Sequence, residues 1–84
     1  MKKIIITGGA GFIGSNFILK QLAETDNHIL NLDILTYAGN LDNLVSVADN
    51  PRYQFVEGDI TDASLVEAII QDFQPDGIIH FAAE

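Results

Sequence analysis

A glycine-rich turn that follows an apolar run is the part of this sequence whose residue types point most directly to chemistry. Residues 7–15 read Thr-Gly-Gly-Ala-Gly-Phe-Ile-Gly-Ser and follow the isoleucines at positions 4–6. Gly8 is expected to turn the chain with a positive φ, because glycine has no Cβ to clash with the backbone. Gly11 would leave room for a phosphate beside the backbone, and Gly14 would let the following helix pack closely on the strand.

A strand, a glycine turn and a helix N-terminus in succession are typical of sites that bind the pyrophosphate of a dinucleotide. The free N–H groups of the first helical turn would face the phosphates, and the helix dipole would favour their negative charge. The alternative is an ordinary glycine-rich connection that binds nothing. We favour the binding site because an acidic residue stands at a matching distance downstream.

That residue is Asp33, which ends a second apolar run beginning at His28. It lies about 20 residues after Gly14, the offset expected for a carboxylate that binds the adenosine ribose hydroxyls. Such a carboxylate also repels a 2′-phosphate, and the next residues, Ile34 and Leu35, offer no positive charge to offset it. The pattern therefore predicts NAD rather than NADP. The alternative is that Asp33 only caps or turns the chain after a strand.

Two more loops follow predicted strands, at the edge where ligands bind in parallel sheets. Thr36 and Gly39 lie in the loop after Asp33 and are candidates for the wall of an adenosine pocket. After the third strand, Asp59 is placed to reach the adenine amino group, and Ile60 would pack on the ring. Without the fold context, the favoured interpretation of Asp59 is that it only begins the turn into the next helix, because acidic residues are common in such turns.

The last candidate segment, residues 81–84, leaves the fourth predicted strand beside the first. The small side chains of Ala82 and Ala83, between Phe81 and Glu84, would leave room for the ribose and phosphates on the nicotinamide side; close packing of strand on helix is equally compatible. His80 is interpreted as a hydrogen-bonded core histidine rather than a catalyst. The sequence contains no Tyr-x-x-x-Lys pair, no Ser/His/Asp arrangement and no metal-ligand cluster, so we assign no catalytic residue and no metal site.

The composition excludes several classes of function. The 84 residues include 4 basic and 12 acidic side chains, which give a net charge of −8. A chain this acidic is not expected to bind nucleic acid or an anionic membrane through a basic surface. The absence of cysteine excludes disulfides and thiolate metal sites. No apolar run is long enough for a membrane span or a signal peptide, so we expect a cytoplasmic protein.

Short apolar runs alternate with helical stripes and predict an α/β fold. Strands are predicted at residues 2–7, 29–33, 53–57 and 78–82. Helices are predicted at 11–24, at 41–48 and after Asp62. The last of these helices has an apolar stripe at Leu65, Val66, Ile69, Ile70 and Phe73. This order predicts a Rossmann-like, doubly wound parallel sheet with strand order 3-2-1-4. We expect the chain to be the N-terminal portion of an NAD-binding domain, with a substrate domain elsewhere in a longer protein.

With these residues assembled, the chain resembles the extended short-chain dehydrogenase/reductase family, whose glycine turn is matched by residues 7–14. Within that family it is most similar to the dTDP-glucose 4,6-dehydratases, through residues 33–41, 58–60 and 80–84. The resemblance covers the whole chain, and residues 35–39, Leu-Thr-Tyr-Ala-Gly, are its most specific part. Sugar-nucleotide 4-epimerases share the glycine turn but usually lack this loop and the Ala-Ala-Glu ending.

The resemblance implies NAD contacts at Phe12, Ile13, Asp33, Ile34, Leu35, Thr36, Asp59, Ile60, Phe81, Ala82, Ala83 and Glu84. It implies an NAD-dependent homodimeric enzyme that removes water from a nucleotide sugar, dTDP-glucose, to give the 4-keto-6-deoxy sugar. The family's Tyr-x-x-x-Lys and Asp-Glu pairs are expected beyond position 84, so the 84 residues alone are expected to be inactive. A 4-epimerase and a non-catalytic dinucleotide-binding module remain open as alternatives, and the presence of those two pairs would favour an enzyme over the binding module.

Overall fold

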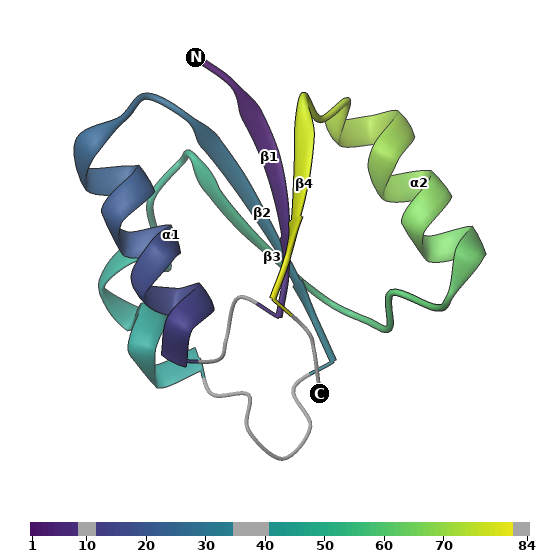
Figure 1. Ribbon diagram of the computed structural model, residues 1–84, viewed down its shortest axis with the longest axis horizontal. Coiled ribbons are helices and arrows are strands. Elements are labelled where there is room, and N and C mark those ends of the chain that lie inside the picture. Colours follow the sequence, from purple (N-terminus) through teal and green to yellow (C-terminus); the bar gives the residue numbers. More distant parts are fainter. Residues whose placement is uncertain (9–11, 35–40, 82–84) are drawn as a thin grey trace.

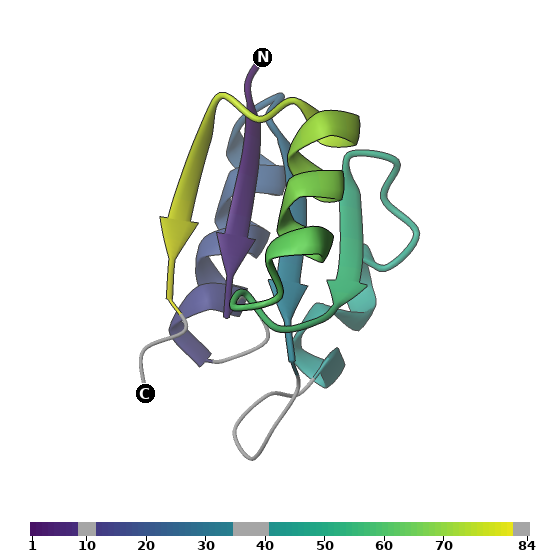
Figure 2. The same cartoon turned by 90° about the vertical axis from the view of Figure 1, so that its right-hand side faces the viewer.

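Four parallel strands form the sheet, in the order β3-β2-β1-β4 that the sequence predicts. The structure, a computed structural model, describes residues 1–8, 12–34 and 41–81. The strands are β1 (Lys3–Thr7), β2 (His28–Asp33), β3 (Tyr53–Glu57) and β4 (Gly77–His80). Because all four run in the same direction, their carboxyl ends lie together at one edge of the sheet, the lower edge in Figures 1 and 2.

Helices cover both faces of the sheet, so the fold is doubly wound (Figure 1). The helix α1 (Phe12–Glu24) and the 3₁₀ helix η1 (Leu41–Val47) lie on one face, and α2 (Ala63–Phe73) lies on the other. The sequence prediction of a Rossmann-like α/β fold is thereby confirmed. Most boundaries differ by one residue, because β1 begins at Lys3, β2 at His28 and β4 at Gly77, and the segment predicted as a helix at 41–48 is a 3₁₀ helix that ends at Val47. The largest difference is at the end of the fourth strand, which is predicted to reach residue 82 and ends at His80.

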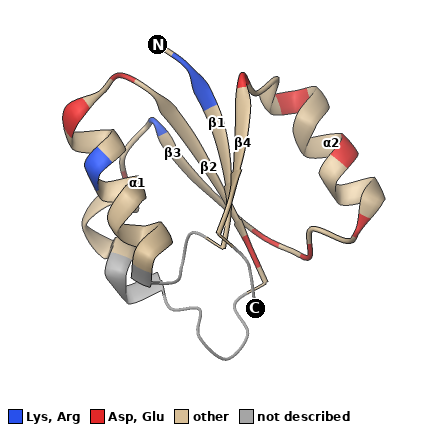
Figure 3. Cartoon of the chain, viewed as in Figure 1, with Lys and Arg blue, Asp and Glu red and all other residues tan. Residues whose placement is uncertain are grey.

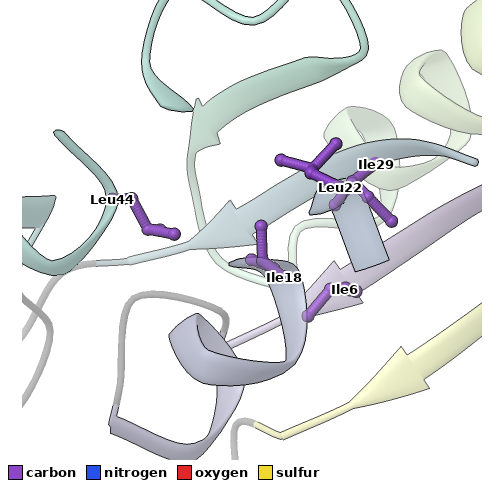
Figure 4. Packing of buried hydrophobic residues seen from close by; sticks show 5 residues of the cluster. All are labelled: Ile6, Ile18, Leu22, Ile29 and Leu44. Carbon is purple, nitrogen blue, oxygen red and sulfur yellow. The ribbon is translucent and has the colours of Figure 1, made fainter. Parts of the chain in front are cut away.

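Two hydrophobic cores, one on each face, hold these layers together. On the α1 face, one cluster combines side chains from both central strands and both helices, at Ile6, Ile18, Leu22, Ile29 and Leu44 (Figure 4). On the α2 face, Ile5, Leu30, Leu32 and Ile69 form the second cluster. Neighbouring residues along a strand point to opposite faces, which explains why Ile5 and Ile6 belong to different cores. The runs of isoleucine and leucine in β1 and β2 therefore reflect burial on both faces.

The helix α2 has a capping residue at each end, Asp62 and Gln74. Asp62 is the N-cap, as predicted, and its side chain accepts a hydrogen bond from the Leu65 N–H at 3.2 Å. Gln74 ends the helix in the left-handed conformation, with φ of 53°. The predicted apolar stripe is wrong at one position, because Ile70 is 40% exposed while Ile69 is buried. Ile70 faces away from the sheet because the inward side of this helix runs through Leu65, Ile69 and Phe73.

At the amino edge of the sheet, a single arginine joins three segments. Arg52, just before β3, donates from Nη2 to the Leu22 carbonyl at 2.9 Å and from Nη1 to the Thr25 and Asn27 carbonyls at 2.7 and 3.2 Å. These carbonyls belong to the last turn of α1 and to the loop that leads into β2. The half-buried guanidinium thus satisfies acceptors that a helix C-terminus leaves without intrahelical partners.

Candidate functional site

A pocket of about 150 Å³ opens at the carboxyl ends of β1, β2 and β3. Its wall contains two pairs of residues predicted from the sequence: Asp33 with Ile34 after β2, and Asp59 with Ile60 after β3. These pairs are far apart in the chain and meet because β2 and β3 are adjacent and parallel. The structure therefore brings both predicted carboxylates to one cavity, at the edge where parallel sheets bind ligands.

Backbone hydrogen bonds continue past the strand ends and fix the rim of this pocket. The Gly8 N–H donates to the Leu32 carbonyl at 3.0 Å, and the Gly58 N–H donates to the Asp33 carbonyl at 3.1 Å. On the other side of β1, the Phe81 N–H donates to the Thr7 carbonyl at 2.7 Å. Each strand is thus tied to its neighbour at the residue where it turns into a candidate binding segment.

The beginning of the glycine turn has the conformation that the sequence predicts. Gly8 has a φ of 74°, a backbone conformation that residues with a Cβ rarely adopt. The helix α1 then begins at Phe12, with Ile13 70% exposed and Gly14 buried. The turn therefore leaves β1 sharply, and the helix N-terminus opens at the same edge of the sheet as the pocket.

Asp59 shapes the turn into α2 and also lines the pocket. Its Oδ1 accepts a hydrogen bond from the Thr61 N–H at 2.9 Å, which shapes the turn into α2. That backbone bond, with the Thr61 side chain, lowers the pKa of the exposed Asp59 carboxyl below its usual value. The side chain is therefore ionised at neutral pH while it also lines the pocket.

The positive charges of the chain lie away from this pocket. All four basic residues fall within the described parts: Lys2 and Lys3 at the start of β1, Arg52 before β3 and Lys20 on α1 (Figure 3). Acidic residues lie on α2 and at the carboxyl ends of β2 and β3, and also at the amino edge, at the end of α1 and before β4 (Figure 3). Within the described residues, the pocket offers an anion no Lys or Arg partner, so a phosphate here would depend on backbone N–H groups.

His80 is hydrogen-bonded as expected but does not lie in the core. Its Nδ1 and the Thr7 Oγ1 are joined by a hydrogen bond of 2.5 Å between β4 and β1. His80 is exposed, whereas Thr7 is buried. The expectation of a core histidine is wrong because α2 packs over β2 and β3, through contacts such as Leu30 with Ile69. Of the described helices, none covers this face of β4, where Ile78 is 52% exposed.

The other predicted contacts divide into two groups. Phe81 is half-buried and its ring lies 5.6 Å from that of Phe17, centroid to centroid, so its side chain packs against the α1 core. Gly11, Leu35, Thr36, Gly39, Ala82, Ala83 and Glu84 lie outside the described residues. Three pocket residues were missed by the sequence reasoning: Thr7, Leu32 and Gly58. Each adjoins a residue or motif that was predicted, and that adjacency is the signal that identifies them.

We expect Gly58→Ala to destabilise the protein by about 1 kcal/mol, at the low end of the cost of overpacking, because the clash falls on the end of a leucine side chain. An added Cβ at Gly58 would lie 2.2 Å from Leu65 Cδ2, so the leucine must move. Removing the obstacle with Leu65→Ala should make the double variant less destabilised than the sum of the two single variants. Thermal unfolding measures each variant. Gly77→Ala is the matched control, because nothing lies within 4 Å of a Cβ there; strictly additive losses would contradict the clash.

The described segments lack two kinds of feature. None of their helices is long and apolar enough to cross a membrane. Nor do these segments contain a group of three or more His, Cys, Asp or Glu side chains that could hold a metal ion.

Comparison with known proteins identifies similar chains over the whole length. The family model described as GDP-mannose 4,6-dehydratase matches residues 5–84. The dTDP-glucose 4,6-dehydratase of Neisseria meningitidis serogroup B is 48% identical over 84 residues, which are 100% of this chain and 24% of that protein. The sequence-based resemblance to these dehydratases is thereby confirmed. This chain spans about a quarter of the length of the relatives that it matches.

Solved structures agree with this result. The dTDP-glucose 4,6-dehydratase of Bacillus anthracis, solved in complex with NAD, superposes with a TM-score of 0.95 at 46% identity, over 100% of this chain and 27% of that one. The UDP-Glc/GlcNAc 4-epimerase of Campylobacter jejuni superposes with a TM-score of 0.84 at 38% identity, over 100% of this chain and 25% of that one. The arrangement of strands and helices is therefore shared by enzymes of two different activities.

Proposed function

We propose, from the premise that this chain belongs to the GDP-mannose 4,6-dehydratase family, that it is the NAD-binding portion of a nucleotide-sugar 4,6-dehydratase. One observation carries the proposal: the carboxylates of Asp33 and Asp59 line a single pocket at the carboxyl edge of a parallel sheet. The glycine turn begins at the same edge, with Gly8 in its positive-φ conformation. The NAD bound by the Bacillus anthracis relative supports the same cofactor here.

The described residues suggest how the adenosine half of NAD would be held. Asp33, at the end of β2, would accept hydrogen bonds from the two ribose hydroxyls. Asp59 would accept from the adenine amino group, and Ile60, 40% exposed beside it, would pack on the ring. The pyrophosphate would lie at the N-terminus of α1, which begins at Phe12. No basic side chain is needed for this arrangement, because helix N–H groups and the helix dipole favour the negative charge.

The reaction proposed for the whole protein is the conversion of dTDP-glucose to its 4-keto-6-deoxy product. When bound, NAD would supply a reversible hydride store, taking a hydride from C4 and giving it back at C6, while C5 loses and regains a proton, so that the net change is the loss of one water. The contribution of this chain is to bind and orient the cofactor, since we assign it no catalytic acid or base. The 48% identity to a dTDP-glucose 4,6-dehydratase over the full chain supports this substrate.

A 4-epimerase is the second candidate, and the Campylobacter jejuni structure is the observation that favours it. A non-catalytic dinucleotide-binding module is the third. An assay of the whole protein separates the three, because a dehydratase forms a 4-keto-6-deoxy sugar from dTDP-glucose, an epimerase inverts C4, and a binding module does neither. The substrate domain, the homodimer and the cytoplasmic location stay predictions from the sequence.

The cofactor assignment predicts that the protein binds NAD more tightly than NADP, and that Asp33→Ala weakens NAD binding at least tenfold. Hydrogen bonds to a charged acceptor contribute about 1.5–3 kcal/mol, and 1.4 kcal/mol is a factor of ten. Isothermal titration of the whole protein measures both affinities. Asp26→Ala is the matched control, because it removes an exposed acid from the α1–β2 loop at the opposite edge. Equal affinity of the wild type for NAD and NADP would refute the assignment.

A further inference from the structure

A side-chain hydrogen bond joins the ends of the two strands from which the candidate binding segments leave. Thr7 is the last residue of β1 and His80 is the last residue of β4, and the two are paired in the sheet. The hydrogen bond between Thr7 Oγ1 and His80 Nδ1 adds a side-chain contact to this final backbone pair. One residue further on, β1 becomes the glycine turn at Gly8, and β4 continues into Phe81.

The proposed function gives this position particular importance. The glycine turn would hold the pyrophosphate, and residues 81–84 are predicted to contact the nicotinamide side of NAD. Gly8 and Phe81, the first residues of the two segments, follow Thr7 and His80 directly, so the relative position of Gly8 and Phe81 depends on how firmly Thr7 and His80 are joined. The backbone hydrogen bond from the Phe81 N–H to the Thr7 carbonyl, at 2.7 Å, also joins the two strand ends. On its own, this bond restrains only the distance between those two atoms.

We propose that the Thr7–His80 hydrogen bond is a positioning contact, which sets the distance and twist between Gly8 and Phe81, the first residues of the two segments, before NAD binds. The inference rests on the proposed function and assigns a role to two residues that would not themselves react. Pre-forming a binding geometry increases affinity because less order must be created when the ligand arrives.

Three features of the two residues support a positioning role over a purely structural one. Thr7 is 2% exposed, so its hydroxyl needs a partner, and the structure provides one across the strand pair. Thr7 also lines the pocket that contains Asp33 and Asp59, so a displacement of Thr7 would reach the adenosine site as well. His80 is exposed and therefore adds little to the hydrophobic core.

The experiment compares variants of the whole protein by NAD titration, at a temperature well below the melting temperature of each. Thr7→Val keeps the shape of the side chain and removes the hydroxyl, so NAD binding should weaken about three- to tenfold, the equivalent of one hydrogen bond. Thr7→Ser restores the hydroxyl and should recover the affinity. His80→Phe should weaken NAD binding as much as Thr7→Val does. The double variant should bind NAD no more weakly than either single variant, because both changes remove the same hydrogen bond.

A matched control separates positioning from stability. Thr25→Val removes a hydroxyl that donates to the Gln21 carbonyl at 2.6 Å, at the opposite edge of the sheet. It should lower the melting temperature without changing NAD affinity. If Thr7→Val binds NAD as tightly as the wild type, or if Thr25→Val weakens binding equally, the positioning role is overturned.

Amide hydrogen exchange provides a readout that does not depend on the cofactor. In the NAD-free protein, Thr7→Val should speed exchange at the Phe81 and Gly8 N–H groups more than at Ile6, while Thr25→Val should not. Unchanged exchange at Phe81 and Gly8 would overturn the inference even if affinity fell. If the wild type binds no NAD, the proposed function fails, whereas the exchange data still decide whether this bond fixes the two strand ends.

Discussion

Replacing Arg52 by alanine should lower the free energy of unfolding by about 2–4 kcal/mol, the largest stability loss that we expect from any surface position. The guanidinium donates to the carbonyls of Leu22, Thr25 and Asn27, which belong to the end of α1 and the following loop. Hydrogen bonds from charged groups contribute about 1.5–3 kcal/mol each, reduced here because the site is only half-buried. The positive charge also stabilises the negative end of the α1 dipole.

Denaturant unfolding measures the loss, and two further variants define its cause. Arg52→Lys should recover only part of the stability, because one ammonium group cannot reproduce a planar guanidinium that reaches three carbonyls. Lys20→Ala removes an exposed positive charge from α1 without a comparable contact and should change stability by less than about 0.5 kcal/mol. A loss of the same size in Lys20→Ala and Arg52→Ala would show that net charge, and not the contact, is responsible.

Replacing Gly8 by valine should weaken NAD binding tenfold or more. Gly8 has a φ of 74°, a region that costs L-amino acids about 1–2 kcal/mol and that is especially unfavourable for a branched side chain. The variant would relieve this strain by changing the turn, which would displace the backbone N–H groups proposed to face the pyrophosphate. Gly8→Asn is the matched control, because asparagine tolerates the left-handed region.

Titration with NAD distinguishes the two variants, and thermal unfolding monitors the fold. Gly8→Asn should retain most of the affinity, and Gly8→Val should lose it while β1 and β2 remain paired. The hydrogen bond from the Gly8 N–H to the Leu32 carbonyl is the structural reason to expect that the loss begins at the pocket rim. A valine variant that binds NAD as well as the asparagine variant would show that the turn's conformation does not matter for binding.

The fold was predictable because its signals are local and mutually consistent. The apolar runs in β1 and β2 are short and follow or precede helical stripes, and the alternation of strand and helix leaves few possible topologies. The Asp62 cap and the positive φ of Gly8 were predictable for a similar reason, since each is determined by a residue type at the end of an element. Asp33 and Asp59 were identified from their places after strands, and parallel pairing then brought them together.

The features that escaped prediction depend on contacts between distant segments. Nothing near Arg52 in the sequence indicates that its side chain reaches the end of α1, some 30 residues earlier. The crowding around Gly58 arises from Leu65 on another element. The exposure of His80 follows from where α2 crosses the sheet, because an apolar strand pattern gives no information about which neighbour covers it.

The position of β1 between β2 and β4 has a consequence for how the chain folds as it is synthesised. Among the described elements, β1 is made first and becomes an internal strand, and one of its partners, β4, is made last. During that interval β1 and β2 can pair and pack under α1, but the other side of β1 stays open. Parallel pairing over such a separation is slow, and unpaired apolar edges are prone to aggregation. The nascent chain is therefore most vulnerable along β1, and a chaperone would be most useful there.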